Sequence, residues 1–279
     1  MGEPWNHSML NKSGLNCERC KHVKHINHGS EKETLSSLQD FCLQNPSAVV
    51  GYIHNKGSLH PTPGNMVLRR FLTASVLSTV SLNLPASCSM CSGRVSPFPH
   101  PHVSGNMWAA RCEYVNLLLK PLDFSGKMQQ FWNAHSSEAP WPASPPWWIG
   151  LERFSAEHWL LSHPSVAPCD IYEGPFNWAY LIDANMRSGK WRPALHIGLR
   201  KPFNRYTAAS DANIERGFPL QRWMKWRCLE WKALYPNANL DSAWLFKVNS
   251  TEKFEACAKA APQSHEHQRR HRHSQHHPH

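Results

Sequence analysis

The chain has 279 residues, of which 41% are apolar and 18% charged, while Pro, His and Trp occur 22, 19 and 13 times. This mix excludes a coiled coil and a charge-rich, wholly disordered chain. The net charge of +10 favours polyanionic partners, such as nucleic acid, anionic lipid or a sugar-nucleotide diphosphate, without choosing among them. No apolar run is long enough to span a membrane, and the first residues lack a signal-peptide pattern. We therefore expect a soluble protein, cytoplasmic by default.

The first half of the chain predicts alternating helices and strands after an irregular segment at 1–27. Apolar residues recur at helical spacing over 31–43, and the predicted helix ends before a proline because the residue preceding a proline avoids helical backbone angles. An apolar strand at 48–53 leads into a polar loop at 54–60, and a second helix is expected at 65–78. This order is half of an α/β unit, in which ligands bind at the carboxyl end of a strand.

The second half is richer in proline and tryptophan. Residues 83–104 predict an irregular connection rich in Pro, Ser and Cys, and residues 133–149 predict a Pro/Trp-rich loop without regular structure. A strand is expected near 180–182. Helices are expected over 106–119, 153–162 and 219–235.

The end of the chain has a different composition. The last stretch holds seven of the 19 histidines and little that could be buried, which predicts a disordered tail. The expected organisation is an irregular segment at 1–27, one α/β domain at 28–248 and a tail at 249–279.

The cysteines predict either free thiols or a metal site. Nine is an odd number, so they cannot all pair, and without a signal peptide we expect a reducing compartment. Two C-x-x-C pairs with histidines nearby could supply a tetrahedral structural zinc through Cys17, Cys20, Cys88 and Cys91. Because a predicted helix and strand separate the two pairs, free buried thiols remain the alternative.

Three stretches combine polar and aromatic residues of the kinds that a carbohydrate site needs. Aromatic faces stack on sugar rings, Asn and His bind hydroxyls, Lys or Arg neutralises a diphosphate, and a carboxylate can act as general base. Taken singly, His158 could also be an ordinary core histidine, and Lys56 an ordinary solvent-exposed lysine in a loop. No phosphate-loop, dinucleotide-binding, zinc-protease, serine-hydrolase or calcium-loop motif is present, and there is no Asp-x-Asp. The candidates are His54, Lys56, Ser58, His102, Ser104, Asn106, Trp108, Glu157 and His158.

The segments YIHNKGS (52–58), HVSGNMWAARCEYV (102–115) and ERFSAEHWLLSHP (152–164) resemble, in order and spacing, a family of glycosyltransferase-like proteins with capsule-type bacterial members and algal and protist relatives. The resemblance covers residues 28–245. It implies an α/β, nucleotide-sugar-transferase-like fold, with a mixed sheet, flanking helices and long irregular Pro/Trp-rich loops. About 50 residues precede the Tyr52 strand, where the donor-binding half of such a fold needs two or three β-α units, so the fold is expected to be incomplete at its N-terminus. By position, the resemblance marks the nine candidates above and Gly105.

The leading hypothesis is a glycosyltransferase that moves a sugar from a nucleotide-sugar donor to a hydroxyl of a glycan or other acceptor. Glu157 and His158 are its expected catalytic residues, with Glu157 as base. Lys56, Arg69 and Arg70 are expected to hold phosphate, and Asn106 and Trp108 to orient the sugar. Mn²⁺ or Mg²⁺ could accompany the donor, without ligands that the sequence identifies.

Two alternatives remain open. The first is a non-catalytic carbohydrate- or partner-binding remnant that lost the donor half of the fold. The second is a zinc-dependent nucleic-acid-binding protein built on the two C-x-x-C pairs, the basic charge and the His/Arg tail. The basic residues form no dense stripe, so nucleic acid is the less favoured partner.

Overall fold

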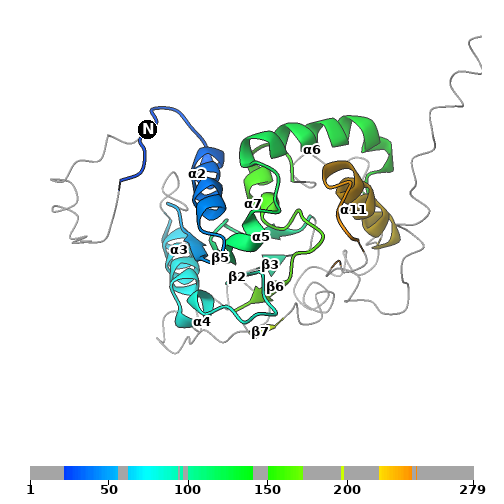
Figure 1. The fold of residues 1–279 in the computed structure, drawn as a ribbon. Helices are drawn as coiled ribbons and strands as arrows, with labels where there is room; N and C mark the ends of the chain where they lie inside the picture. Colours follow the sequence, from blue (N-terminus) through cyan, green and yellow to red (C-terminus); the bar gives the residue numbers. More distant parts are fainter. Residues whose placement is uncertain are drawn as a thin grey trace, which may run out of the picture.

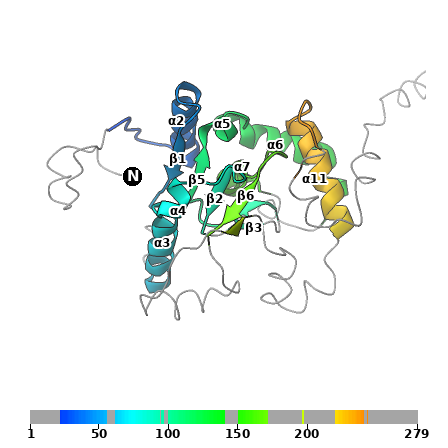
Figure 2. The ribbon, with the colours of Figure 1, turned by 60° about the horizontal axis from the view of Figure 1, so that its bottom comes forward.

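The centre of the molecule is a mixed β-sheet (Figures 1 and 2). The computed structural model describes residues 22–55, 62–93, 95–96, 100–140, 150–171, 196–197, 220–240 and 243. Its main sheet has the strand order β1-β5-β2-β6-β7. The bounds of these strands are β1 Val49–Tyr52, β5 Trp108–Arg111, β2 Met90–Ser92, β6 Pro168–Asp170 and β7 His196–Ile197.

The strand pairings combine both directions. β5 is antiparallel to β1 and to β2, β2 is parallel to β6, and β6 is antiparallel to β7. The expected mixed α/β architecture with flanking helices is therefore confirmed. The helix, turn and strand expected at 31–53 are present as α2 and β1, and in the described sheet β1 pairs with the antiparallel β5.

Helices cover both faces of the sheet, as Figures 1 and 2 show. Side chains alternate along β5 and the residue before it. Trp108 and Ala110 enter the largest apolar cluster, whereas Met107 and Ala109 enter two smaller ones on the other face. The large cluster packs against α2 (Glu31–Gln44), α5 (Cys112–Val115), α6 (Pro121–His135), α7 (Ser155–Trp159) and α11 (Leu220–Leu234). The smaller clusters lie under α3 (Pro63–Val76) and α4 (Thr79–Leu82).

A small second sheet leads into β5. It consists of β3 (Val95–Ser96) and β4 (His102–Val103), which pair antiparallel. Two 3-10 turns, η1 (Ser136–Glu138) and η3 (Glu152–Phe154), follow α6 and precede α7. α7 contacts β4, so the small sheet and this helix meet beside the main core.

Most of the predicted helices are confirmed. α2, α3 and α11 match the helices expected at 31–43, 65–78 and 219–235 within a few residues, and η3 with α7 replaces the helix at 153–162.

The helix expected at 106–119 is wrong over its first half, because Trp108–Arg111 is the strand between β1 and β2 and only the short α5 follows it. The connection at 83–104 holds β2 to β4, and α6 and β6 were not expected. The loop without regular structure expected at 133–149 is wrong at its start, because α6 continues to His135 and η1 follows it. Residues 141–149 of that loop and the strand near 180–182 lie outside the described residues.

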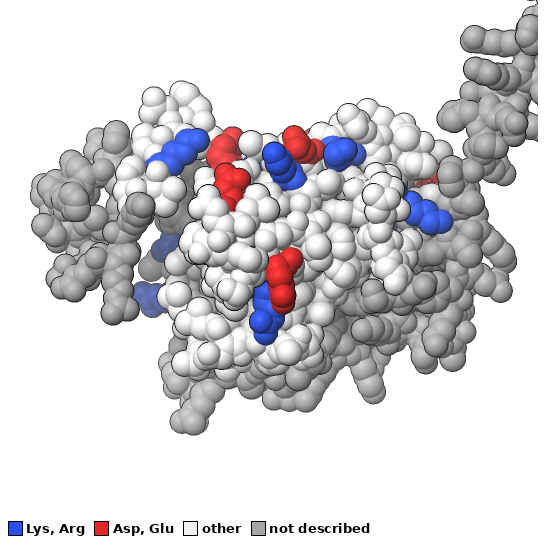
Figure 3. Space-filling model, viewed as in Figure 1, with Lys and Arg blue, Asp and Glu red and all other residues white. Residues whose placement is uncertain are grey.

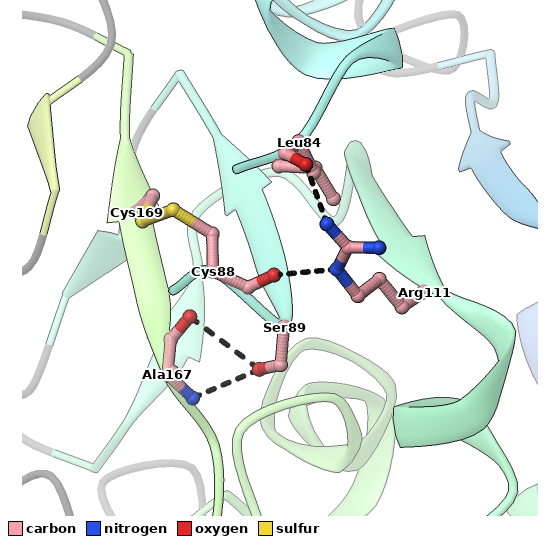
Figure 4. The surroundings of a disulfide bond; sticks show 6 residues. All are labelled: Leu84, Cys88, Ser89, Arg111, Ala167 and Cys169. Carbon is pink, nitrogen blue, oxygen red and sulfur yellow. Dashed lines mark hydrogen bonds between the residues drawn. A yellow bond between two sulfur atoms is a disulfide. The ribbon is translucent and has the colours of Figure 1, made fainter. Parts of the chain in front are cut away.

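Two disulfides between described residues join distant parts of the chain. Cys42 on α2 is bonded to Cys112 on α5, and Cys88 is bonded to Cys169 on β6. In Figure 4, Arg111 donates hydrogen bonds to the carbonyls of Cys88 and Leu84, at 3.0 and 2.5 Å. The expectation of free or metal-bound thiols is therefore wrong for these four cysteines.

The charged side chains on the face seen in Figure 3 are of both signs and interspersed over the described surface. Within the described part of the chain, no helix is both long and apolar enough to cross a bilayer. The tail expected at 249–279 lies outside the described residues.

Candidate functional site

The end of β1 carries the first cluster of candidate residues. β1 and β5 pair with Tyr52 opposite Trp108, and two residues further the same register sets His54 level with Asn106. Glu31, the first residue of α2, reaches both of these side chains. Its Oε1 lies 3.6 Å from His54 Nδ1, and its Oε2 accepts a hydrogen bond of 2.5 Å from Asn106 Nδ2. Three elements far apart in sequence thus bring a carboxylate, an imidazole and an amide together.

The start of α2 explains the position of Glu31. The Ser30 side chain accepts a hydrogen bond from the Lys32 N–H, and the Glu33 side chain accepts one of 2.7 Å from the Ser30 N–H. This capping box fixes where the helix begins. The hydrogen bonds from Ser30 lower the pKa of Glu33. Glu31 lies in the first turn, where the helix dipole stabilises a negative charge.

Two aromatic rings hold the amide and the imidazole in place. Trp108 Nε1 donates to Asn106 Oδ1 at 3.0 Å, which leaves the Asn106 Nδ2 to face Glu31. Asn106 has a φ of 47°, a left-handed conformation that Asn adopts more readily than most residues. The Tyr52 ring stacks on His54 and tilts against Trp108. Burial, reinforced by the charge of Glu31, raises the pKa of Tyr52.

Only part of this cluster is open to solvent. The side chains of Glu31 and His54 are 36% and 19% exposed to solvent, whereas Asn106 and Trp108 are buried. Trp108 therefore offers no ring face for stacking on a sugar and instead orients Asn106. His54 Nε2 lies 2.8 Å from the carbonyl oxygen of Gly105. A carbonyl can only accept, so Nε2 carries the hydrogen and Nδ1 faces Glu31.

The expected phosphate-binding residues are placed only in part. Lys56 and Ser58 lie outside the described residues. Arg69 on α3 donates from Nη1 to Asn55 Oδ1 at 3.4 Å, and Asn55 directly follows His54. α3 therefore brings a guanidinium group to the segment that follows β1.

His102 in β4 and Ser104 on the turn between β4 and β5 form a second pair. Ser104 Oγ lies 3.1 Å from His102 Nε2, and His102 Nδ1 lies 2.7 Å from the carbonyl oxygen of His100. Both side chains of the pair are half-buried. Gly105, next to Ser104, is the residue whose carbonyl contacts His54, so this pair adjoins the first cluster along the chain.

The two expected catalytic residues on α7 lie in different surroundings. Glu157 is half-buried, whereas His158 is fully buried. His158 Nδ1 lies 2.6 Å from the Pro101 carbonyl oxygen, and its Nε2 lies 2.7 Å from Oε1 of Glu230 on α11. His158 is therefore a core residue that joins α7 to α11, in line with the plainer of its two interpretations.

Arg227 completes this buried cluster. It lies one helical turn before Glu230, and its Nη1 donates to Glu230 Oε2 and lies 3.3 Å from His158 Nε2. Burial alone would raise the pKa of Glu230, but Arg227 and His158 outweigh it, so the pKa is lowered and the carboxylate stays ionised. Burial lowers the pKa of Arg227 because it disfavours the charged guanidinium, and the negative charge of Glu230 opposes this effect only in part. A charged, paired group without exposure is a structural element rather than a site that substrate reaches.

The structure does not form the zinc site expected from the two C-x-x-C pairs. Cys88 is bonded to Cys169, so its sulfur is not the thiolate that zinc binds. Cys91 is a free thiol, but burial raises its pKa to about 11, which disfavours the thiolate. Cys17 and Cys20 lie outside the described residues. Among the residues that the structure describes, no group of three or more His, Cys, Asp or Glu is placed to hold a metal.

Sequence reasoning missed three charged residues. Glu31 is the carboxylate of the open cluster, and the Ser-x-x-Glu pattern beginning at Ser30 could have marked it as the start of a helix. Arg227 and Glu230 lie on a helix that was expected, but no local pattern relates them to His158, some 70 positions earlier. Their contact depends on tertiary packing alone.

Comparison with known proteins leaves these sites without a precedent of stated function. No curated protein and no solved structure matches the chain. A family model described as a domain of unknown function (DUF8361) matches residues 1–248, which is most of the sequence. The chain therefore belongs to the DUF8361 family.

Proposed function

We propose that this protein transfers a sugar from a nucleotide-sugar donor to a hydroxyl acceptor, with Glu31 as the general base. The observation that carries the proposal is the open cluster at the end of β1. Glu31 meets His54 and Asn106 there, and both of these residues belong to the segments that resemble glycosyltransferase-like proteins. We choose Glu31 instead of Glu157 as the base because the Glu31 side chain contacts His54 and Asn106 directly.

The geometry suits removal of a proton from a hydroxyl. A carboxylate that keeps 36% of its exposure can be reached by an acceptor alcohol. Its second oxygen is held by Asn106, whose amide is in turn fixed by the buried Trp108. This support limits the rotation of the carboxylate, and a base that is already oriented lowers the entropic cost of proton transfer.

The donor diphosphate needs positive charge near the same site. Arg69 is hydrogen-bonded to Asn55, one residue after His54. We assign Arg69 to the diphosphate, together with Lys56, whose position is known from the sequence alone. A guanidinium group binds phosphate oxygens through paired N–H donors, which stabilises the leaving group.

The first test is binding. Titration calorimetry of the full chain against a panel of nucleotide sugars, with and without Mn²⁺, is expected to show at least one donor that binds. Arg69→Gln should weaken that donor, and Lys127→Gln on α6 serves as a matched charge control. If no member of the panel binds, the transferase proposal fails.

The second test separates the base from its neighbours. With a donor identified, Glu31→Gln should lower kcat by about 10²- to 10⁴-fold while donor affinity stays the same. Glu33→Gln is the control, since it removes a carboxylate two residues away and Gln still suits the capping box.

Loss of turnover in Glu157→Gln instead of Glu31→Gln would overturn the choice of base. Glycan binding without turnover, unchanged in Glu31→Gln, would favour the non-catalytic alternative.

A further inference from the structure

We propose that Ser104 is a nucleophile activated by His102, which gives this chain an esterase-type activity toward small carboxylic esters. This activity is distinct from the proposed sugar transfer and uses other atoms. His102 is the first residue of β4, Ser104 lies on the turn that follows β4, and both residues are half-buried, so the pair keeps part of its surface exposed to solvent.

The hydrogen bonds fix the tautomer of His102. The carbonyl oxygen of His100 lies 2.7 Å from His102 Nδ1 and can only accept, so Nδ1 carries a hydrogen. In the neutral ring, Nε2 then presents its lone pair, and the Ser104 hydroxyl lies 3.1 Å from it. A serine hydroxyl that faces a histidine, oriented from behind by a third group, is the arrangement of an activated serine nucleophile.

The third group here is a carbonyl, and its position is well supported. His100 is buried, and its ring packs against His102 and edge-on against the buried His158. Gly150, with a φ of 77°, leaves room for this packing, since a Cβ there would lie 2.9 Å from His158 and 3.0 Å from His100. The buried cluster therefore serves as a rigid support for the acceptor behind His102.

The turn itself presents the hydroxyl. The Asn106 N–H donates to the Val103 carbonyl at 2.8 Å, which closes a four-residue β-turn with Ser104 and Gly105 in the middle. Gly105 has a φ of 81°, the positive value that a type II turn requires at its third residue. Ser104 therefore occupies a corner with a fixed backbone, and the N–H of Gly105 directly after it is the donor that we assign to the oxyanion.

The reaction balances without a cofactor. Ser104 Oγ forms a bond to the carbonyl carbon of the ester while its proton passes to His102 Nε2. The bond to the alcohol then breaks, and the departing alkoxide takes that proton. Water, deprotonated by His102, next attacks the carbonyl carbon of the acylated Ser104. The bond from that carbon to Ser104 Oγ breaks, His102 returns the proton to Oγ, and the carboxylic acid is released. The net change is one ester and one water converted to an acid and an alcohol.

A second Ser–His pair provides an internal control. Ser165 Oγ lies 2.7 Å from His163 Nδ1, with the same spacing of two residues. In that pair, however, the lone pair of Nδ1 also accepts the Ser165 N–H at 3.2 Å, and burial lowers the pKa of His163 to about 4. A nitrogen so occupied and so weakly basic is a poor base at neutral pH, so Ser165 should stay unreactive.

The test is a covalent probe on the full chain. A fluorophosphonate forms a phosphorus–oxygen bond to an activated serine and releases fluoride. We expect one adduct per chain by intact mass and its position at Ser104 by peptide mapping. An absent adduct, or labelling of Ser104 and Ser165 to the same extent, would overturn the proposal.

Turnover gives a second readout. With p-nitrophenyl acetate, the wild-type chain should release a burst of about one p-nitrophenolate per chain, which Ser104→Ala abolishes and His102→Asn slows by about 10²- to 10⁴-fold. Ser165→Ala should leave the burst unchanged. Glu33→Gln should leave it unchanged too. The failure of either proposal can be recognised separately, because the burst is measured without a nucleotide sugar. A burst that survives Ser104→Ala in a folded variant would contradict the proposal.

Discussion

Among the histidine–glutamate pairs of the described residues, His158–Glu230 and His54–Glu31 use the same side chains for opposite purposes. His158 and Glu230 are fully buried, with 2.7 Å between Nε2 and Oε1, and Arg227 balances the charge. His54 and Glu31 are separated by 3.6 Å and keep 19% and 36% of their exposure. The first pair joins α7 to α11 inside the core, whereas the second leaves a carboxylate available to solvent. Burial, rather than residue type, separates a structural pair from a candidate site.

The largest expected effect is a loss of unfolding free energy when the buried pair of His158 and Glu230 is broken. Breaking the exposed pair of His54 and Glu31 should not cause a comparable loss. Glu230→Gln leaves Arg227 buried without a counter-charge, and breaking a buried ion pair in this way costs about 3–5 kcal/mol of unfolding free energy. Glu31→Gln, at an exposed pair, should cost less than about 1 kcal/mol. Urea unfolding at pH 7 measures both. Equal losses in the two variants would break the distinction between the pairs.

The same distinction marks what the sequence could predict. Apolar periodicity identified α2, α3 and α11, because the apolar face of a helix is a local pattern. The helix expected at 106–119 failed because Trp108–Arg111 is held as a strand by partners on both sides, which local propensity does not include.

The candidate site follows the same rule. His54 and Asn106 were both named as candidates from the sequence, but only the register of β1 with β5 shows that they lie together. Glu31 joins them from a helix that begins more than 20 residues before His54. His158 was placed in the correct helix, but its partners Arg227 and Glu230 come from α11, some 70 residues later. Residue types were thus readable from the sequence, and their partners were not.

A smaller effect is expected where the open cluster enters the core. Asn106→Gly keeps the left-handed backbone but removes the acceptor of Trp108 Nε1, and a buried donor without a partner costs about 1–3 kcal/mol. Trp108→Phe removes the donor as well, so the two changes together should cost less than the sum of the single changes. A double-mutant cycle in urea measures this coupling, which we expect to be about 1 kcal/mol. Simple additivity would mean that Trp108 does not orient Asn106.

The smallest effect concerns a histidine that contacts a hydroxyl and an aromatic ring in the described structure rather than a carboxylate. Burial lowers the pKa of His163 from its ordinary 6.5 to about 4, and its ring packs edge-on against Tyr235. Between these two pH values the unfolded chain binds a proton at His163 that the folded chain does not. The free energy of unfolding therefore has its full value with respect to His163 above pH 6.5 and decreases as the pH falls toward 4.

The lowered pKa of Glu230 acts in a different window, because its contribution is present above the ordinary value of 4.5 and is lost only as pH falls below it. Urea unfolding at pH 7.0 and 5.0 therefore isolates His163. His163→Gln should reduce the difference in stability between these two pH values, whereas the exposed His28→Gln should leave it unchanged. If His163→Gln left the difference unchanged, the His163 ring would be protonated at pH 5.0 in the folded protein as it is in the unfolded chain. His163 would then not be a weaker base than the histidines that face carboxylates.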